Sequence, residues 1–372
     1  MNPNEAAVGS QATDEGAHIV SLSLVIPAYN EGLRLADGMS RLRSAIAAGA
    51  IVPESTEFVV VDDGSTDDTT AKAIDLFSSF PHVHHVRLPE NHGKGGAVRA
   101  GVAVASAPII AFADADMAID PAQTPQFILA LTEADLAIGS RAATGAAVNR
   151  PSLRRSIMNR VFNRLTNVLT RVALDDTQCG FKAFRAPAAK LLFHCSITER
   201  FAFDVEILSL ARRLGLTIAQ VPVQWMRVRG SQIRPWTDAR SMARDVVRAG
   251  RGGASSMPVP TLTVAPAGED SDAGCPPSLA ALRRALPPGL PVLLRDGGLL
   301  VLCPLMEEPA IAATAARIVE QFPGAIPERT DTTMAQLIRM SPLQMIGDDD
   351  GTSRRVQTPP TPTLIAGKPS GS

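Results

Sequence analysis

The stretch Leu22-Ser-Leu-Val-Ile-Pro-Ala-Tyr-Asn-Glu31 decides the fold, because it joins a short apolar run to a polar turn, and a helical pattern follows over residues 33–48. Phe58-Val-Val-Val-Asp-Asp-Gly-Ser-Thr66 repeats this arrangement, with a helical pattern over 67–80. Three more apolar runs follow at similar intervals, at residues 83–88, 109–112 and 136–138. Apolar runs that each lead into a helix are typical of a parallel sheet covered on both faces. The sequence therefore predicts a doubly wound α/β domain.

Length and composition exclude several classes of protein. The 372 residues are 45% hydrophobic and 20% charged, so the chain can bury a sizeable core and is not disordered throughout. The formal net charge of -1 does not suggest a nucleic-acid binder. The four cysteines lie far apart without the spacing of a zinc site or of a disulfide framework. We therefore expect a protein of the reducing cytoplasm.

The composition changes near residue 252, which predicts a division of the chain into segments. We expect five segments: a flexible tail over 1–20, the α/β domain over 21–252, a linker over 253–280, a small α/β appendage over 281–347 and a disordered tail over 348–372. Within the appendage, the pattern predicts a hairpin over 290–302 and a helix over 307–322. No catalytic constellation is evident there.

Two arginine-rich segments lie beyond the predicted strands. Residues 150–171 contain six arginines and no acidic residue, and residues 227–251 contain seven arginines and two aspartates. Such segments form either solvated helix faces packed on the sheet or an interfacial surface that faces anionic lipid. No apolar stretch reaches the roughly 20 residues that span a bilayer. Any membrane association is therefore expected to be peripheral.

Polar residues follow every predicted strand, at the carboxyl edge where such sheets bind ligands. The five loops are Ala28-Tyr-Asn-Glu31, Asp62-Asp-Gly-Ser-Thr66, Asn91-His-Gly-Lys-Gly-Gly96, Asp114-Ala-Asp116 and Gly139-Ser-Arg141. Asp114 and Asp116 offer hard oxygen ligands for Mg²⁺ or Mn²⁺ shared with a diphosphate. An acidic triplet can also cap a helix, although Asp120 before Pro121 is the better cap here.

The other loops allow two interpretations each. The turn after the second run either caps the next helix, with Ser65 or Thr66 accepting backbone donors, or lets Asp62 and Asp63 accept hydrogen bonds from a nucleobase and ribose. Glu31 is either a first-turn acid favoured by the helix dipole or a hydrogen-bond acceptor for the nucleoside. Lys94, at the start of a helix, is either an exposed lysine in a glycine-rich turn or a counter-ion for a nucleotide diphosphate. The Walker pattern Gly-x-x-x-x-Gly-Lys-Ser/Thr is absent, which disfavours nucleotide hydrolysis of that type.

Together, the five loops closely resemble those of the inverting family-two glycosyltransferases of GT-A fold. Three later motifs resemble the dolichyl-phosphate β-glucosyltransferase branch: Asp176-Thr-Gln-Cys-Gly-Phe-Lys182, Phe203-Asp-Val-Glu206 and Val221-Pro-Val-Gln-Trp225. The resemblance covers about residues 22–235. It implies a Rossmann-like sheet, a nucleotide-sugar donor with UDP-glucose expected, a Mg²⁺ or Mn²⁺ ion, and a polyprenyl phosphate acceptor.

The resemblance also implies roles for individual residues. Those implied to bind the nucleotide sugar are Pro27, Tyr29, Glu31, Asp62, Asp63, Lys94, Asp114 and Ala115, with Asp114 and Asp116 also holding the metal. Those implied to bind the acceptor are Arg141, Gln178, Lys182 and Glu206. Catalytic roles are implied for Asp116, Arg141, Lys182 and Asp204.

The expected function is therefore transfer of a sugar to polyprenyl phosphate with inversion, at the cytoplasmic face of a membrane. A phosphate monoester, with a second pKa near about 6, is largely ionised at neutral pH and can attack without a base, guided by a cation such as Arg141. A lipid acceptor favours the interfacial interpretation of the basic segments. Two alternatives stay open: a soluble transferase that uses Asp204 or Glu206 as a base towards a hydroxyl, and a non-catalytic nucleotide-sugar-binding module.

Overall fold

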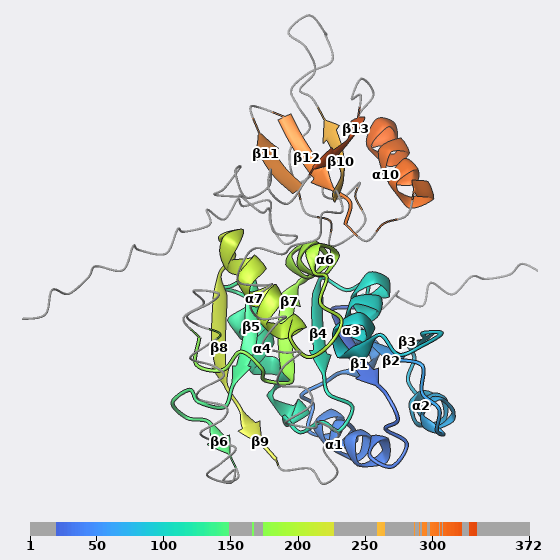
Figure 1. Cartoon of the computed structure of the whole chain (residues 1–372), viewed down its shortest axis with the longest axis vertical. Helices are drawn as coiled ribbons and strands as arrows, with labels where there is room; N and C mark the ends of the chain where they lie inside the picture. The colour runs from blue at the N-terminus through green and yellow to red at the C-terminus, as the bar shows by residue number, and fades with distance from the viewer. Residues whose placement is uncertain are drawn as a thin grey trace, which may run out of the picture.

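A seven-stranded sheet with helices on both faces forms the main body (Figure 1). Its strand order is β3-β2-β1-β4-β7-β5-β8. The strands are β1 (Leu22–Ala28), β2 (Thr56–Asp62), β3 (Val83–Arg87), β4 (Ile109–Ala113), β5 (Leu136–Ser140), β7 (Phe181–Arg185) and β8 (Ile218–Pro222). The predicted α/β fold is confirmed. This computed structural model describes residues 20–148, 166, 174–226, 259–264, 286, 290, 292–295, 298–304, 306, 308–321 and 327–332.

The sheet is mostly parallel, and strand β7 is the exception. β1 pairs in parallel with β2 and β4, and β5 pairs in parallel with β8. β7 lies between β4 and β5 and is antiparallel to both. The sequence pattern missed this strand because Lys182 interrupts its apolar run. Because β7 runs antiparallel to β4 and β5, its amino end lies at the same edge as the carboxyl ends of these two strands.

Each face of the sheet has its own core. Successive residues of a strand point to opposite faces, so Val25 and Val59 belong to one core and Leu24 and Phe58 to the other. The first core is covered by α3 (Gly93–Val104), α6 (Ala186–Cys195) and α7 (Phe203–Arg213). The second is covered by α1 (Leu35–Ala47), α2 (Thr69–Phe77) and α4 (Thr124–Ala130).

Local signals in the sequence explain where two of these helices lie. A Cβ atom at Gly101 would lie 2.3 Å from the Val25 Cγ1 atom, so this glycine lets α3 approach the sheet closely. Asp120 accepts a hydrogen bond of 2.9 Å from the Ala122 backbone in the short helix η2 (Pro121–Gln123), which leads into α4. The expected cap is therefore confirmed, and Asp114 and Asp116 are not needed for it.

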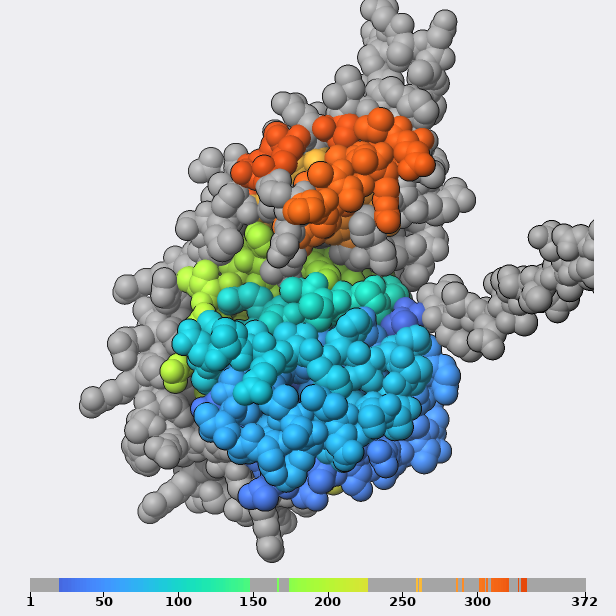
Figure 2. Space-filling view, turned by 90° about the vertical axis from the view of Figure 1, so that its right-hand side faces the viewer, coloured from blue at the N-terminus to red at the C-terminus, as the bar shows by residue number. Residues whose placement is uncertain are grey.

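A smaller antiparallel sheet with one helix forms a second unit (Figure 1), whose described atoms are coloured orange in the space-filling view of Figure 2. Its strands, in spatial order, are β11 (Val292–Arg295), β12 (Gly298–Leu302), β10 (Val259–Val264) and β13 (Pro327–Thr332), and its helix is α10 (Glu308–Gln321). The hairpin and helix predicted for this region are present. Val259 and Leu302 pack with the core of the main body.

The structure corrects the boundary of this unit. Strand β10 falls inside the range predicted as a linker, 253–280, yet it pairs with β12 and β13. The surrounding prolines and serines hid the strand pattern of Val259–Val264, in which Val259, Thr261 and Leu262 are buried.

Several predictions fall outside the described residues. They concern the tails at 1–19 and 348–372 and, apart from Thr166, the arginine-rich segments at 150–171 and 227–251. Strands β6 (Ala147–Val148) and β9 (Gln224–Trp225) pair in parallel. In the chain, β6 comes shortly before the segment 150–171, and β9 comes shortly before the segment 227–251. In the part of the chain that the structure describes, no helix has the length and apolar character needed to cross a membrane.

Candidate active site

The carboxyl edge of the sheet gathers most of the predicted site residues. Loops after β1, β2, β4 and β5 meet there, as expected for parallel strands. The antiparallel β7 adds the segment before it, since Phe181 pairs with Ala113 at the end of β4. Residues 176–180, which the sequence order alone does not bring to this edge, therefore join the site.

Asp114 and Asp116 form an acidic pair directly after β4. Asp116 accepts a hydrogen bond of 3.1 Å from the Ala118 backbone. Burial, and then the charge of Asp114, raise the pKa of Asp116. A Cβ atom at Gly180 would lie 2.0 Å from the Asp114 Oδ2 atom, so only glycine lets the carboxylate rest against this segment. The intervening Ala115 is buried, and its carbonyl lies against Gly38 of α1.

Each carboxylate of the pair has a cationic neighbour. The Lys94 Nζ atom lies 2.6 Å from Asp114 Oδ1, and the Arg34 Nη1 atom lies 3.6 Å from Asp116 Oδ2. Burial opposes the charge of Lys94, but Asp114 and Asp204 outweigh it and hold the pKa of the ammonium above its ordinary value. Lys94 also lies 5.5 Å from the centre of the Phe112 ring. The sequence pattern did not identify Arg34, although its position three residues after Glu31 was a usable signal.

This donor set fits a divalent cation that is shared with a substrate. No group of three or more His, Cys, Asp or Glu side chains is arranged to hold a metal within the described residues. Two carboxylates would suffice for Mg²⁺, which usually takes one or two protein carboxylates and completes its shell with phosphate oxygens and water. Asp114, with 39% of its side chain exposed, is open to such an ion.

Arg141, directly after β5, is held by Asp176. Its Nε and Nη2 atoms donate hydrogen bonds of 2.6 Å and 2.9 Å to the two carboxylate oxygens. Burial opposes the charge of Arg141, but the hydrogen bonds and charge of Asp176 raise the pKa of the guanidinium. Burial likewise opposes ionisation of Asp176, and Arg141 reverses this and lowers its pKa. Gln178, also predicted for the acceptor side, lies beside this pair through its backbone N–H, which donates to Asp176.

The loop after β1 presents Tyr29 and Glu31. Tyr29 is exposed, and Pro27 is partly buried within the strand. Glu31 contacts Arg34, while its buried Oε2 atom has no hydrogen-bond partner among the described residues. Burial raises the pKa of Glu31 to about 7, against the opposing charge of Arg34. An unsatisfied buried oxygen is costly, so Glu31 is suited to accept a hydrogen bond from a ligand.

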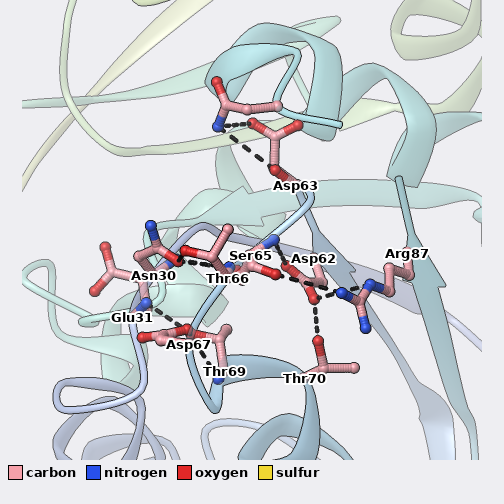
Figure 3. A network of polar contacts seen from close by, with 11 residues as sticks. Asn30, Glu31, Asp62, Asp63, Ser65, Thr66, Asp67, Thr69, Thr70 and Arg87 are labelled. Carbon is pink, nitrogen blue, oxygen red and sulfur yellow. Dashed lines mark hydrogen bonds and ion pairs between the residues drawn. The ribbon is translucent and has the colours of Figure 1, made fainter. Parts of the chain in front are cut away.

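The two aspartates after β2 face different partners (Figure 3). Asp62 accepts hydrogen bonds from the Ser65 backbone, at 2.8 Å, and from the Thr70 hydroxyl, and it lies 3.8 Å from the Arg87 Nε atom. Asp62 is therefore held by its own turn, with Arg87 beside it. Arg87 was not among the predicted site residues, and it is the most exposed member of this group.

Asp63 turns towards the start of α3 instead. Its carboxylate accepts hydrogen bonds of 2.8 Å from both the His92 and Gly93 backbones, and Asn91 donates a third of 3.0 Å. These bonds are those of a helix cap. Asp63 therefore caps the start of α3, a role that the sequence pattern did not predict.

The glycine-rich start of α3 is also occupied by protein groups. In addition to the bonds to Asp63, the Gly96 backbone donates a hydrogen bond of 3.0 Å to the Glu199 carbonyl. Three backbone donors of this helix start, those of His92, Gly93 and Gly96, are therefore already satisfied. The Lys94 side chain is the charged group by which this helix can reach a diphosphate.

Lys182, Asp204 and Glu206 lie beneath the site, which corrects the contacts that the resemblance implied for them. Lys182 has no exposed surface, and its Nζ atom donates to Asp204, at 2.6 Å, and to the Cys179 carbonyl, at 2.8 Å. Glu206 accepts hydrogen bonds from the backbones of residues 197 and 198, and burial raises its pKa. All three are buried and engaged by the protein, so they support the site rather than meeting a ligand.

The carboxyl edge of this α/β sheet presents an acidic pair, a lysine and an arginine. These groups suit a transferase that binds a diphosphate-activated donor. The profile of the family described as Glycosyl transferase family 2 matches residues 23–193. A dolichyl-phosphate beta-glucosyltransferase of Dictyostelium discoideum is 34% identical over 243 residues, covering 62% of this chain and 73% of that protein. The Homo sapiens protein of the same name is 33% identical over 238 residues, covering 61% and 74%.

The chain belongs to glycosyltransferase family 2, within the dolichyl-phosphate β-glucosyltransferase branch, and is an enzyme with the GT-A fold. Among solved structures, glucosyl-3-phosphoglycerate synthase from Mycobacterium tuberculosis, in complex with Mn²⁺, UDP and glucosyl-3-phosphoglycerate, aligns with a TM-score of 0.47. It is 22% identical and covers 65% of this chain and 84% of that chain.

Proposed function

We propose that the enzyme transfers glucose from UDP-glucose to a polyprenyl phosphate, with inversion to a β-linked product. The names of its relatives support the phosphorylated lipid acceptor and the glucosyl group. The observation that carries the proposal is Arg141, a cation at the carboxyl edge held by Asp176, in the same short segment as Gly180, which lies against Asp114. An acceptor phosphate bound there would lie beside the donor diphosphate.

The residues at the carboxyl edge would have different roles in the reaction. Glu31 and Tyr29 would hold the nucleoside, with Asp62 shaping that side of the site. Lys94 would leave Asp114 to neutralise the diphosphate of the donor as it becomes the leaving group. A divalent ion held by Asp114 and Asp116 would supply further positive charge to the same diphosphate. Arg141 would guide the acceptor phosphate, which needs no base.

The burial of Asp204 and Glu206 supports a phosphate acceptor over a hydroxyl acceptor. A hydroxyl acceptor needs a base within hydrogen-bond reach. Asp204 is paired with Lys182, and Glu206 accepts backbone hydrogen bonds, so neither carboxylate is open to a substrate. A nucleophile that is already ionised avoids this requirement.

Binding to the cytoplasmic face of a membrane is part of the proposal. A lipid acceptor must be reached at the bilayer surface, and the arginine-rich segments 150–171 and 227–251 offer charge for it. Each basic residue near an anionic leaflet contributes about 1 kcal/mol. Sedimentation with vesicles tests this part: we expect stronger binding to anionic than to neutral lipid, and equal binding to both would contradict it.

A panel of nucleotide sugars tests the reaction itself. The purified enzyme is incubated with polyprenyl phosphate, Mg²⁺ or Mn²⁺, and UDP-glucose, GDP-mannose or UDP-N-acetylglucosamine. We expect a labelled lipid product from UDP-glucose, with a β linkage by NMR. Arg141→Ala should raise the acceptor KM or lower turnover while UDP affinity survives. The proposal fails if no donor in the panel labels the lipid phosphate, or if Arg141→Ala leaves acceptor kinetics unchanged.

A further inference from the structure

Asp176 is saturated by hydrogen-bond donors, most of which come from one residue. It accepts hydrogen bonds from three Arg141 atoms: the backbone N at 3.0 Å, Nε at 2.6 Å and Nη2 at 2.9 Å. The Gln178 backbone donates a fourth of 3.2 Å. Only 5% of the Asp176 side chain is exposed, against 27% for Arg141. The carboxylate is thus a buried anchor, and the guanidinium extends from it towards solvent.

The geometry of this pair leaves one side of the guanidinium for a ligand. An arginine carries five N–H donors in a rigid planar fork. Asp176 takes the edge formed by Nε and Nη2, so the two donors on Nη1 and the second donor on Nη2 remain. One Nη1 donor and the second Nη2 donor lie side by side along the outer edge of the fork, which matches two oxygens of a phosphate, and the other Nη1 donor points away from Asp176.

We propose that Asp176 is a positioning residue that holds Arg141 in the orientation in which its outer edge binds the acceptor phosphate. The inference rests on the proposed function, because it needs Arg141 to meet that phosphate. A free arginine samples many rotamers, and fixing it in advance removes this cost from binding and from the reaction. Asp176 also cancels part of the charge of Arg141, so its contribution lies in orientation and not in attraction.

A second feature of the site agrees with a fixed direction for Arg141. Asp176 is the first residue of the segment that leads through Gly180 into β7, and Gly180 lies against the Asp114 carboxylate. The anchor of Arg141 and the glycine that packs against Asp114 therefore belong to one short stretch of chain, residues 176–180. A shift of Asp176 would move the acceptor cation relative to the donor side of the site.

Asp176→Asn tests the inference with Asp175→Asn as the matched control. The asparagine amide would present its own N–H to Arg141 and break the two-point contact. Asp175 is the exposed neighbour of Asp176, and the same charge is removed there. With citronellyl phosphate as acceptor and the donor selected by the panel, we expect Asp176→Asn to raise the acceptor KM about 10-fold to 100-fold. The donor KM and UDP affinity should stay within about twofold, and Asp175→Asn should resemble the wild type.

A double-mutant cycle separates positioning from a general structural role. In the Arg141→Ala background, adding Asp176→Asn should cause no further loss of kcat/KM for the acceptor. An equal loss in both backgrounds, or an unchanged acceptor KM for Asp176→Asn, would overturn the positioning role while leaving the proposed function intact. Unchanged acceptor kinetics in Arg141→Ala alone would overturn both. Should Asp176→Asn fail to fold, Asp176→Glu carries the same test, because it keeps the ion pair but displaces the carboxylate by one methylene group.

Discussion

Replacing Lys182 by methionine should destabilise the protein strongly, although the two side chains are similar in size. The substitution removes the ammonium that is 2.6 Å from Asp204 and leaves a buried carboxylate without its partner. Breaking a buried ion pair from one side costs about 3 to 5 kcal/mol. Lys94, which also interacts with Asp204, offsets part of this cost, so we expect about 3 kcal/mol.

Urea denaturation followed by circular dichroism measures this effect. With an m value of about 2 kcal/mol/M, a loss of about 3 kcal/mol lowers the midpoint by about 1.5 M. The double variant Lys182→Met, Asp204→Leu removes both charges together. Replacing a buried pair by apolar residues of similar volume is often neutral or stabilising, so the double variant should recover most of the lost stability.

The same double variant decides whether Lys182 touches the acceptor. If the lysine only supports the site, a stable double variant should keep its acceptor KM within about threefold of the wild type. A stable double variant whose acceptor KM rises tenfold or more would refute the reasoning, because it would mean that Lys182 binds the acceptor. A single variant destabilised by less than about 1 kcal/mol would also refute it.

Three further predictions concern other charged groups. Asp63→Ala should lower the free energy of unfolding by about 2 kcal/mol in urea, because it leaves the His92 and Gly93 donors unsatisfied, and an unchanged midpoint would contradict the capping role. Glu31, whose pKa is raised to about 7 from 4.5, makes the folded protein bind more protons than the unfolded chain between these values, so it lowers stability as the pH rises. In metal-free protein the advantage of Glu31→Gln over the wild type should therefore grow by about 2 to 3 kcal/mol from pH 4.5 to pH 8, and a constant difference in urea midpoints would argue against it. Lys94→Met should strengthen Mn²⁺ binding in the absence of nucleotide about tenfold, as measured by electron paramagnetic resonance, because the ammonium no longer competes with the ion for Asp114. The same substitution should weaken UDP binding. Weaker Mn²⁺ binding would exclude this competition.

The strand and loop pattern of the first half of the chain was predictable from local sequence. The runs at 22–26 and 58–61 form β1 and β2, and the polar turns after them lie at the expected edge. Strand β7 was not predictable in the same way, because a fully buried lysine stands in its second position. That lysine is compatible with the sheet only because Asp204, on a distant helix, neutralises it.

The residue types of the site were visible in the sequence, but their roles were not. Asp62 and Asp63 are adjacent and chemically identical, yet one belongs to its own turn and the other caps α3. Asp176 was part of a recognised motif, but nothing local showed that it holds Arg141. Arg34 was overlooked, because its neighbour Asp116 lies far along the chain.

The sequence by itself determined the strands and helices of the first half of the chain and the kinds of side chain at the carboxyl edge, because both follow from short runs of neighbouring residues. Tertiary structure alone decided which charged groups remain open to a ligand. The hydrogen-bond partners of Asp63, Lys182 and Arg141 lie 29, 22 and 35 residues away along the chain. A charge that looks free in a linear motif is neutralised or oriented by groups that only the folded sheet brings within hydrogen-bond distance.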